Sequence, residues 1–260
     1  MKLVLRFLVP FLCIFSLTAC GVQGSYTDQL PDPADLSDPR SFEGVSDVKD
    51  FDDIEPVTDK AEPALPVELT DADGNDVTVT DASRILALDI YGTYTKTLSG
   101  LGLADNIVGR TVSSTEPNLA DLPVVTEGGH NINVEAVLEL QPTLVIVDHS
   151  IGPRDAIDQI RAAGVTTVVM EPERTIDSVG EDITTLGDAL GLPDEARELA
   201  ERSTKEIDEA KGAIKELVPD DPMRVAFLYA RGNGGVFFIM GDGTGAQDLI
   251  EGIGLSLIHI

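Results

Sequence analysis

The sequence predicts an α/β protein of two three-layer lobes joined by a long connecting helix, with the second lobe truncated. Strand and helix patterns alternate along residues 65–172, as in a parallel sheet covered by helices on both faces. Residues 173–221 are mostly helical and end at a Pro-Asp-Asp-Pro boundary. A second strand-led unit begins at residue 222 and is only partial, spanning residues 222–254.

The composition is that of an acidic protein that can form packed cores. The 260 residues include 46 Asp and Glu against 18 Lys and Arg, for a formal net charge of −28, and 42% are hydrophobic. Phosphate backbones recruit clustered Lys and Arg, so this charge argues against a nucleic-acid partner. Both cysteines lie within the first twenty residues, which excludes a disulfide scaffold and a Cys-based zinc site.

Residues 1–19 have the features of a secretory signal peptide, with two basic residues ahead of a short apolar run over residues 7–17. The tetrad Leu-Thr-Ala-Cys at residues 17–20 resembles a bacterial lipobox. That resemblance implies cleavage before Cys20, lipidation of Cys20 and a mature protein held at the outer face of the cell membrane. The alternative is an uncleaved single-span anchor. Both alternatives place the folded part outside the cytoplasm.

The stretch that follows Cys20, to residue 64, is rich in acidic residues and proline and poor in apolar residues. Such a composition cannot support a core, so residues 20–64 are predicted to be a disordered tether. At the other end of the chain, residues 255–260 read LSLIHI, which is what a transposon-end sequencing adaptor would encode. We expect residues 255–260 to be an artefact and the native part of this sequence to stop at Gly254, where the gene fragment was cut, and we assign His259 no chemical role.

The first lobe, residues 65–172, is predicted to open with a hairpin around the turn at residues 71–75. A calcium loop is the alternative, but its glycine belongs at the sixth position and a Glu at the twelfth, where this chain has Gly74 fourth and Ser83 twelfth. The remaining elements come from apolar runs and helix-start signals. Strands are expected at residues 84–88, 107–109, 143–147 and 166–169, and helices at residues 91–101, 133–140 and 153–163.

Two helices and a second strand-led unit are predicted after residue 172. The helices cover residues 176–190 and 194–217, and the second has an apolar stripe at helical spacing with charged residues on its other faces. Strands follow at residues 224–229 and 236–240, and a helix starts at about residue 246. Gly241-x-Gly243-x-x-Ala246 matches the loose dinucleotide fingerprint, but a tight strand-to-helix turn is the preferred interpretation.

Three side chains attract attention as possible ligands or supports of a metal-containing group. His130 follows two glycines that let the backbone approach a bulky ligand, whereas His149 is interpreted as an ordinary loop histidine. Tyr229 and Arg231 lie two residues apart on a predicted strand, so their side chains can converge on one side. A guanidinium beside a phenol favours the phenolate, which binds Fe(III) well. Each feature alone also has an ordinary structural explanation.

Together these features resemble the iron-compound and vitamin B12 type of substrate-binding lipoprotein that serves ABC importers. The resemblance rests on residues 84–88, on the run Asn-x-Glu-x-x-Leu-x-Leu-Gln-Pro-Thr-Leu-Val-Ile from residue 133, and on Gly-Thr-Gly before the last helix, and it covers about residues 68–254. It implies the class III substrate-binding fold. Gly-Gly-His130 with Tyr229-x-Arg231 is similar to the HmuT type of haem-binding protein found in actinobacteria.

That likeness implies a function and its site residues. His130 and Tyr229 would be the axial ligands of ferric haem, one from each lobe, and Arg231 would support the tyrosine. The protein would be a monomer that captures haem and delivers it to an ABC permease with its ATPase, without catalysis. The alternatives are a ferric-siderophore or cobalamin binder of the same superfamily and, from another class, an exported α/β hydrolase or oxidoreductase. The last is disfavoured because the sequence has no nucleophile elbow, HExxH, P-loop or CxxC motif.

Overall fold

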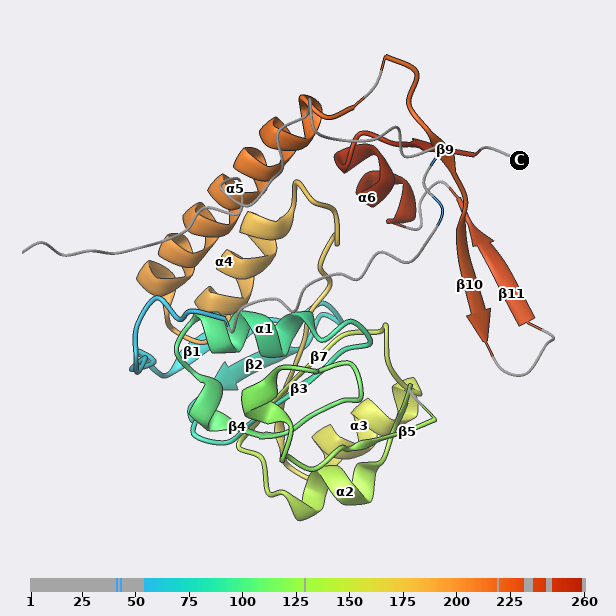
Figure 1. The fold of residues 1–260 in the computed structure, drawn as a ribbon. Coiled ribbons are helices and arrows are strands. Elements are labelled where there is room, and N and C mark those ends of the chain that lie inside the picture. Colours follow the sequence, from blue (N-terminus) through green and yellow to red (C-terminus); the bar gives the residue numbers. More distant parts are fainter. Residues whose placement is uncertain are drawn as a thin grey trace, which may run out of the picture.

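The computed structural model describes residues 41, 43, 54–128, 130–218, 220–231, 236–241 and 245–258 (Figure 1). The predicted signal peptide, Cys20 and most of the predicted tether lie outside these residues. Within the described part of the chain, no helix is both long enough and apolar enough to cross a membrane.

The first lobe is built on a four-stranded parallel sheet with the strand order β4-β3-β7-β8. Its strands are β3 (Ile85–Leu88), β4 (Ile107–Gly109), β7 (Leu144–Val147) and β8 (Thr166–Val169). Every residue of β3 and β7 is buried. This is what central strands covered on both faces require, and it explains why their sequences are continuous apolar runs rather than alternating ones.

Helices cover both faces of this sheet, so the predicted three-layer arrangement of the first lobe is confirmed (Figure 1). Successive strand residues point to opposite faces. Accordingly, Ile85 and Ala87 pack in one core with residues of α1, α4 and α5, while Leu86 and Leu88 pack in the other with residues of α2 and α3. These helices are α1 (Thr93–Gly100), α2 (Val134–Glu139), α3 (Arg154–Ala162), α4 (Val179–Ala189) and α5 (Pro193–Lys215).

A predicted hairpin precedes the sheet, and it is confirmed as β1 (Val67–Thr70) and β2 (Asp76–Val79), an antiparallel pair. The Asp71 carboxylate holds its turn, because one oxygen accepts hydrogen bonds from the backbone N–H groups of Asp73 and Asn75, at 3.1 and 2.8 Å. Its other oxygen accepts a hydrogen bond from Arg161 at 3.0 Å. The acidic turn therefore uses its buried carboxylate for structure.

The second lobe departs from the prediction at its first strand. The expected strand over residues 224–229 is two strands, because β9 (Arg224–Val225) pairs in parallel with β12 (Ser256–Leu257), while β10 (Phe227–Arg231) pairs antiparallel with β11 (Val236–Met240). The apolar run cannot reveal this change of partner, since both halves have the same pattern. Helix α6 (Ala246–Gly252) begins after β11, as predicted for a strand-to-helix turn.

The second lobe was predicted to be only partial, and its described part is small. It consists of the β10–β11 hairpin, α6 and the β9–β12 pair. β12 falls in the segment predicted to be an artefact, and the origin of that segment stays a prediction. The short elements of the first lobe complete the fold: two 3₁₀ turns (Ala104–Asn106 and Pro117–Leu119), β5 (Thr126–Glu127) and β6 (Asn131–Ile132).

One glycine fixes the path of the chain from β3 into α1, and its replacement is the first test of this fold. Gly92, the residue before α1, has φ +70°, and a Cβ atom there would lie 2.4 Å from the carbonyl oxygen of Ser113. Gly92→Ala should therefore lower the free energy of unfolding by about 2 kcal/mol or more. Gly212→Ala is the control, because it lies in the exposed interior of α5 with open space around it and should raise stability by about 0.5–1 kcal/mol. Urea unfolding of both variants measures the difference, and equal stabilities would contradict the described path.

Candidate functional site

The strand order of the first lobe indicates which edge of its sheet is the place for a ligand. The chain moves from β3 to β4 on one side and from β7 to β8 on the other, so the change of direction lies between β3 and β7. In open α/β sheets, ligands bind beyond the carboxyl ends of the strands at such a point. Asp89 directly follows β3 and Asp148 directly follows β7, and both carboxyl side chains are buried.

Arg174 is the counterion of these two acids. Its guanidinium contacts Oδ2 of Asp148 and lies 3.8 Å from Oδ2 of Asp89. The Tyr94 hydroxyl donates a hydrogen bond to the same Asp148 oxygen at 2.8 Å. Burying two carboxylates is expensive unless a cation and hydrogen bonds compensate. The cluster of Asp89, Asp148, Arg174 and Tyr94, here called the edge cluster, supplies both.

Burial raises the pKa of two members of the edge cluster, Asp89 and Tyr94. Desolvation raises the pKa of Asp89 above its ordinary value, although the backbone N–H of Thr93 and the charge of Arg174 oppose this shift. Burial also raises the pKa of the Tyr94 hydroxyl, so Tyr94 stays a neutral donor. None of the four edge-cluster residues was predicted from the sequence as part of a site. The available signal was the acid placed immediately after each of two apolar strands.

His130 lies at the same end of the lobe, in the turn between β5 and β6. Its carbonyl oxygen accepts a hydrogen bond from the backbone N–H of Gly152 at 3.0 Å, which fixes the turn to the loop between β7 and α3. The side chain is half-buried, and its Nδ1 is buried without a hydrogen-bond partner. Gly128 has φ +59°, a conformation that favours glycine, and Gly129 lies outside the described residues.

Tyr229 and Arg231 lie in β10, opposite Phe238 and Val236 of β11. Because they are two residues apart on one strand, they share one face of the hairpin. Their side chains lie outside the described part of the structure. β10 runs from the second lobe toward the side of the molecule where the first lobe lies (Figure 1). The structure therefore places one predicted ligand on each lobe.

His149 has a structural partner. Its Nε2 lies 2.8 Å from Oδ1 of Asp73, in the β1–β2 turn, and Arg154 donates a hydrogen bond to the same oxygen. The hydrogen bond from His149, followed by the positive charges around it, holds the pKa of Asp73 below its usual range. This contact ties the hairpin to the loop after β7 and agrees with the interpretation of His149 as an ordinary loop residue.

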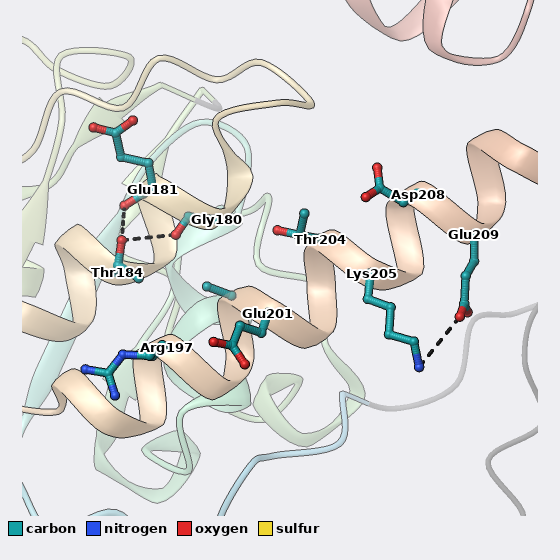
Figure 2. Close-up of a pocket in the computed structure, with 10 residues that line it drawn as sticks. Gly180, Glu181, Thr184, Arg197, Glu201, Thr204, Lys205, Asp208 and Glu209 are labelled. Carbon is teal, nitrogen blue, oxygen red and sulfur yellow. Dashed lines mark hydrogen bonds and ion pairs between the residues drawn. The ribbon is translucent and has the colours of Figure 1, made fainter.

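A groove of about 820 Å³ runs between α4 and α5, and none of the residues above lines it (Figure 2). Gly180, Thr184, Ala200 and Thr204 lie along it, with a rim of charged side chains that includes Lys205, whose Nζ is 3.6 Å from Glu209. The first four of these residues are small and leave the space between the two helices unfilled, which accounts for the groove by packing alone. Across the described residues, no group of three or more His, Cys, Asp and Glu side chains could hold a metal ion.

Comparisons with known proteins agree with this arrangement. A family model described as periplasmic binding protein matches residues 90–258. The crystal structure of the haem-binding protein HmuT is 64% identical with a TM-score of 0.82, over 85% of this chain and 72% of that chain. The lipoprotein YvrC of Bacillus subtilis, an uncharacterized ABC transporter substrate-binding protein, is 28% identical over 62% of this chain and 51% of its own length. A cobalamin-binding protein of Halobacterium salinarum is 29% identical over 66% of this chain and 46% of its own length.

These matches bear on the fold, the class of protein and the extent of the chain. The α/β fold with a parallel sheet is that of the class III binding proteins, as predicted. The family and its solved neighbours are binding proteins rather than enzymes. The chain spans about half the length of the curated relatives it matches.

Solved forms of HmuT include three alanine variants, one each at a histidine, a tyrosine and an arginine. In HmuT the tyrosine follows the histidine by 99 positions, and the arginine follows the tyrosine by two. The same residue types have the same spacings here, at His130, Tyr229 and Arg231.

The edge cluster gives a stability prediction. Arg174→Ala leaves two buried carboxylates without their cation and should lower the free energy of unfolding by about 3 kcal/mol. The matched control is Arg197→Ala, which removes an exposed partner of Asp194 at 2.8 Å and should change stability by less than about 0.5 kcal/mol. Urea unfolding at pH 7 compares the two. An Arg174 variant as stable as the Arg197 variant would contradict the role assigned to the cluster.

Proposed function

The chain belongs to the periplasmic binding protein family, and we propose that it is an extracytoplasmic haem-binding lipoprotein. It captures haem between its two lobes and passes it to an ABC permease and its ATPase. Both partners are proposals from the family, because the chain spans only part of its relatives. The protein acts as a monomer and needs no catalytic cofactor, since haem is its cargo.

The observation that carries this proposal is the pattern of three residues shared with HmuT. Two α/β proteins with 64% identity share a histidine, a tyrosine and an arginine at the same spacings, and one of them is a haem-binding protein. Here His130 lies on the first lobe, while Tyr229 and Arg231 lie on the second. This distribution supports ligation of one haem from opposite sides.

The residue chemistry suits ferric haem. An imidazole nitrogen and a phenolate oxygen are established ligands of haem iron in proteins. Arg231 lies two residues from Tyr229 in β10, and a guanidinium beside a phenol would favour the phenolate over the neutral phenol. The buried, unpartnered Nδ1 of His130 also supports a binding role, because a buried polar atom without a partner is costly and rare.

The anchor completes the proposal. Lipidation of Cys20 would hold the protein at the outer face of the cell membrane through the acidic tether. A tethered carrier meets its permease at a higher effective concentration than a free one does. The tether's acidic residues also repel an anionic surface and keep the folded part in solution.

Haem titration tests the function. The unaltered chain should bind ferric haem saturably with a Soret band. His130→Ala and Tyr229→Ala should each weaken binding by at least about tenfold and shift the band, and Arg231→Ala should weaken it by about tenfold. His149→Ala is the matched control, since its imidazole pairs with Asp73, and it should bind as the unaltered chain does.

The outcomes separate the candidate ligands. If the chain does not bind haem but binds cobalamin, the result would favour the function named for the Halobacterium relative. Equal losses in the His130 and His149 variants would contradict the assignment of His130.

Mass spectrometry of the protein made in a bacterial host tests the anchor. The N-terminal peptide should begin at Cys20 and carry a diacylglyceryl group, and Cys20→Ser should remove it. Cys13→Ser is the matched control and should leave the lipid in place, because Cys13 lies within the cleaved signal peptide. An unlipidated peptide that extends upstream of residue 20 would favour the single-span anchor.

A further inference from the structure

We infer that Tyr91 and Val112 form an apolar wall of the first lobe on which the porphyrin ring lies, and that Arg174 holds the Tyr91 ring in place for this purpose. The inference rests on the proposed haem function and adds residues to it. It concerns the flat macrocycle of the ligand, whereas His130 and Tyr229 concern its iron.

Tyr91 lies on the edge of the lobe that carries His130. The backbone N–H of Ile90, next to Tyr91, donates a hydrogen bond to Oγ of Ser150 at 3.1 Å. Two residues later in the same loop, the N–H of Gly152 donates to the carbonyl oxygen of His130 at 3.0 Å. The loop between β7 and α3 therefore joins the loop that presents Tyr91 to the turn that presents His130.

Val112 belongs to the same surface. Gly92, beside Tyr91, packs so closely on the backbone of Ser113 that a Cβ atom would come within 2.4 Å of it. The backbone N–H of Val112 bonds to Oγ1 of Thr126 at 3.3 Å, in the β5–β6 hairpin whose turn carries His130. The segments that carry Tyr91 and Val112 are thus both tied to the region of the turn that holds the predicted axial ligand.

Both side chains are exposed to solvent. Tyr91 is 58% exposed and Val112 is 47% exposed, although neighbouring residues of the loop and of α1 are buried. Exposed apolar surface at a strand edge where ligands bind is typical of the lining of a binding site. An apolar macrocycle that covered it would recover the free energy of burying it.

The edge cluster explains why the Tyr91 ring is fixed before a ligand arrives. The Arg174 guanidinium lies 4.3 Å from the centre of the Tyr91 ring, a cation–π distance. The two buried carboxylates hold that guanidinium in turn, so its side chain is less free to change conformation than that of an exposed arginine. A ring fixed in the free protein loses less conformational entropy on binding, which strengthens binding without any new contact.

The charges of the edge cluster also define what the wall recognises. Arg174 is already matched by Asp89 and Asp148, so it offers no uncompensated positive charge to a ligand carboxylate. The contribution of Tyr91 therefore comes from its ring surface and does not depend on the iron. Protoporphyrin IX, which has the same macrocycle without iron, isolates this contribution.

The test measures the affinity of the full chain for ferric haem and for protoporphyrin IX. Tyr91→Ala should weaken both by about the same factor, near tenfold, while the Soret position of the haem complex stays unchanged. Tyr91→Phe keeps the ring and should bind both within twofold of the unaltered chain. Lys96→Ala, an exposed change on α1, is the control and should also bind within about twofold. Urea unfolding confirms that the variants are folded.

Each outcome decides the inference. Tyr91→Ala with unchanged affinity for both porphyrins overturns it, and so does a loss confined to haem, which would place Tyr91 at the iron instead. A failure of the proposed function looks different, because the Soret band of the added ferric haem would then stay that of free haem, with no saturable shift on addition of the unaltered chain. That result would contradict both the proposed function and the inference about the apolar wall.

Discussion

The structure of the candidate site on the first lobe depends on one electrostatic constraint. Two buried carboxylates must be neutralised where β3 and β7 end. Asp89 and Asp148 are buried, so their charges need a cation close by. Arg174 supplies it from a backbone with φ +56°, a conformation that non-glycine residues rarely adopt. Such strain persists only where the surrounding contacts determine the conformation, and here the two acids provide them. The ion pairs therefore fix the path of the chain as it leaves the first lobe.

That path also reaches the second lobe. Two residues after Arg174, the backbone N–H of Ile176 donates a hydrogen bond to Oδ2 of Asp248 in α6, at 2.5 Å. The Ile176 side chain also fills the space beside Gly252, where a Cβ atom would lie 2.6 Å from it. A short segment thus joins the edge cluster of one lobe to the helix of the other. These contacts join the first lobe, which carries His130, to α6 of the second lobe, the lobe that carries Tyr229.

The sequence predicted much of this fold because its signals are local. The continuous apolar runs of β3 and β7 follow from burial on both faces, and Asn133 begins α2 by accepting the N–H of Ala136 at 3.0 Å, as its residue type predicts. The split of β9 from β10 was missed because pairing partners are not encoded in a period-two pattern. The edge cluster was missed for a similar reason. Arg174 lies 85 positions from Asp89, and only the sheet brings them together.

The residues of the candidate site also fall into two groups, those that the sequence predicted and those that only the structure revealed. His130, Tyr229 and Arg231 could be chosen from sequence because iron ligation demands particular side-chain types, and a glycine pair or an i, i+2 spacing makes them visible. A wall for a flat ring demands only apolar surface, which Tyr91 and Val112 provide. Exposed apolar side chains are common in proteins, so the sequence does not single these two out. The wall is inferred from the solvent exposure of these two side chains, and exposure can be measured only in a folded structure. Ligand chemistry can therefore be found in a sequence before ligand shape can, and the shape-determining residues are those that a folded structure adds.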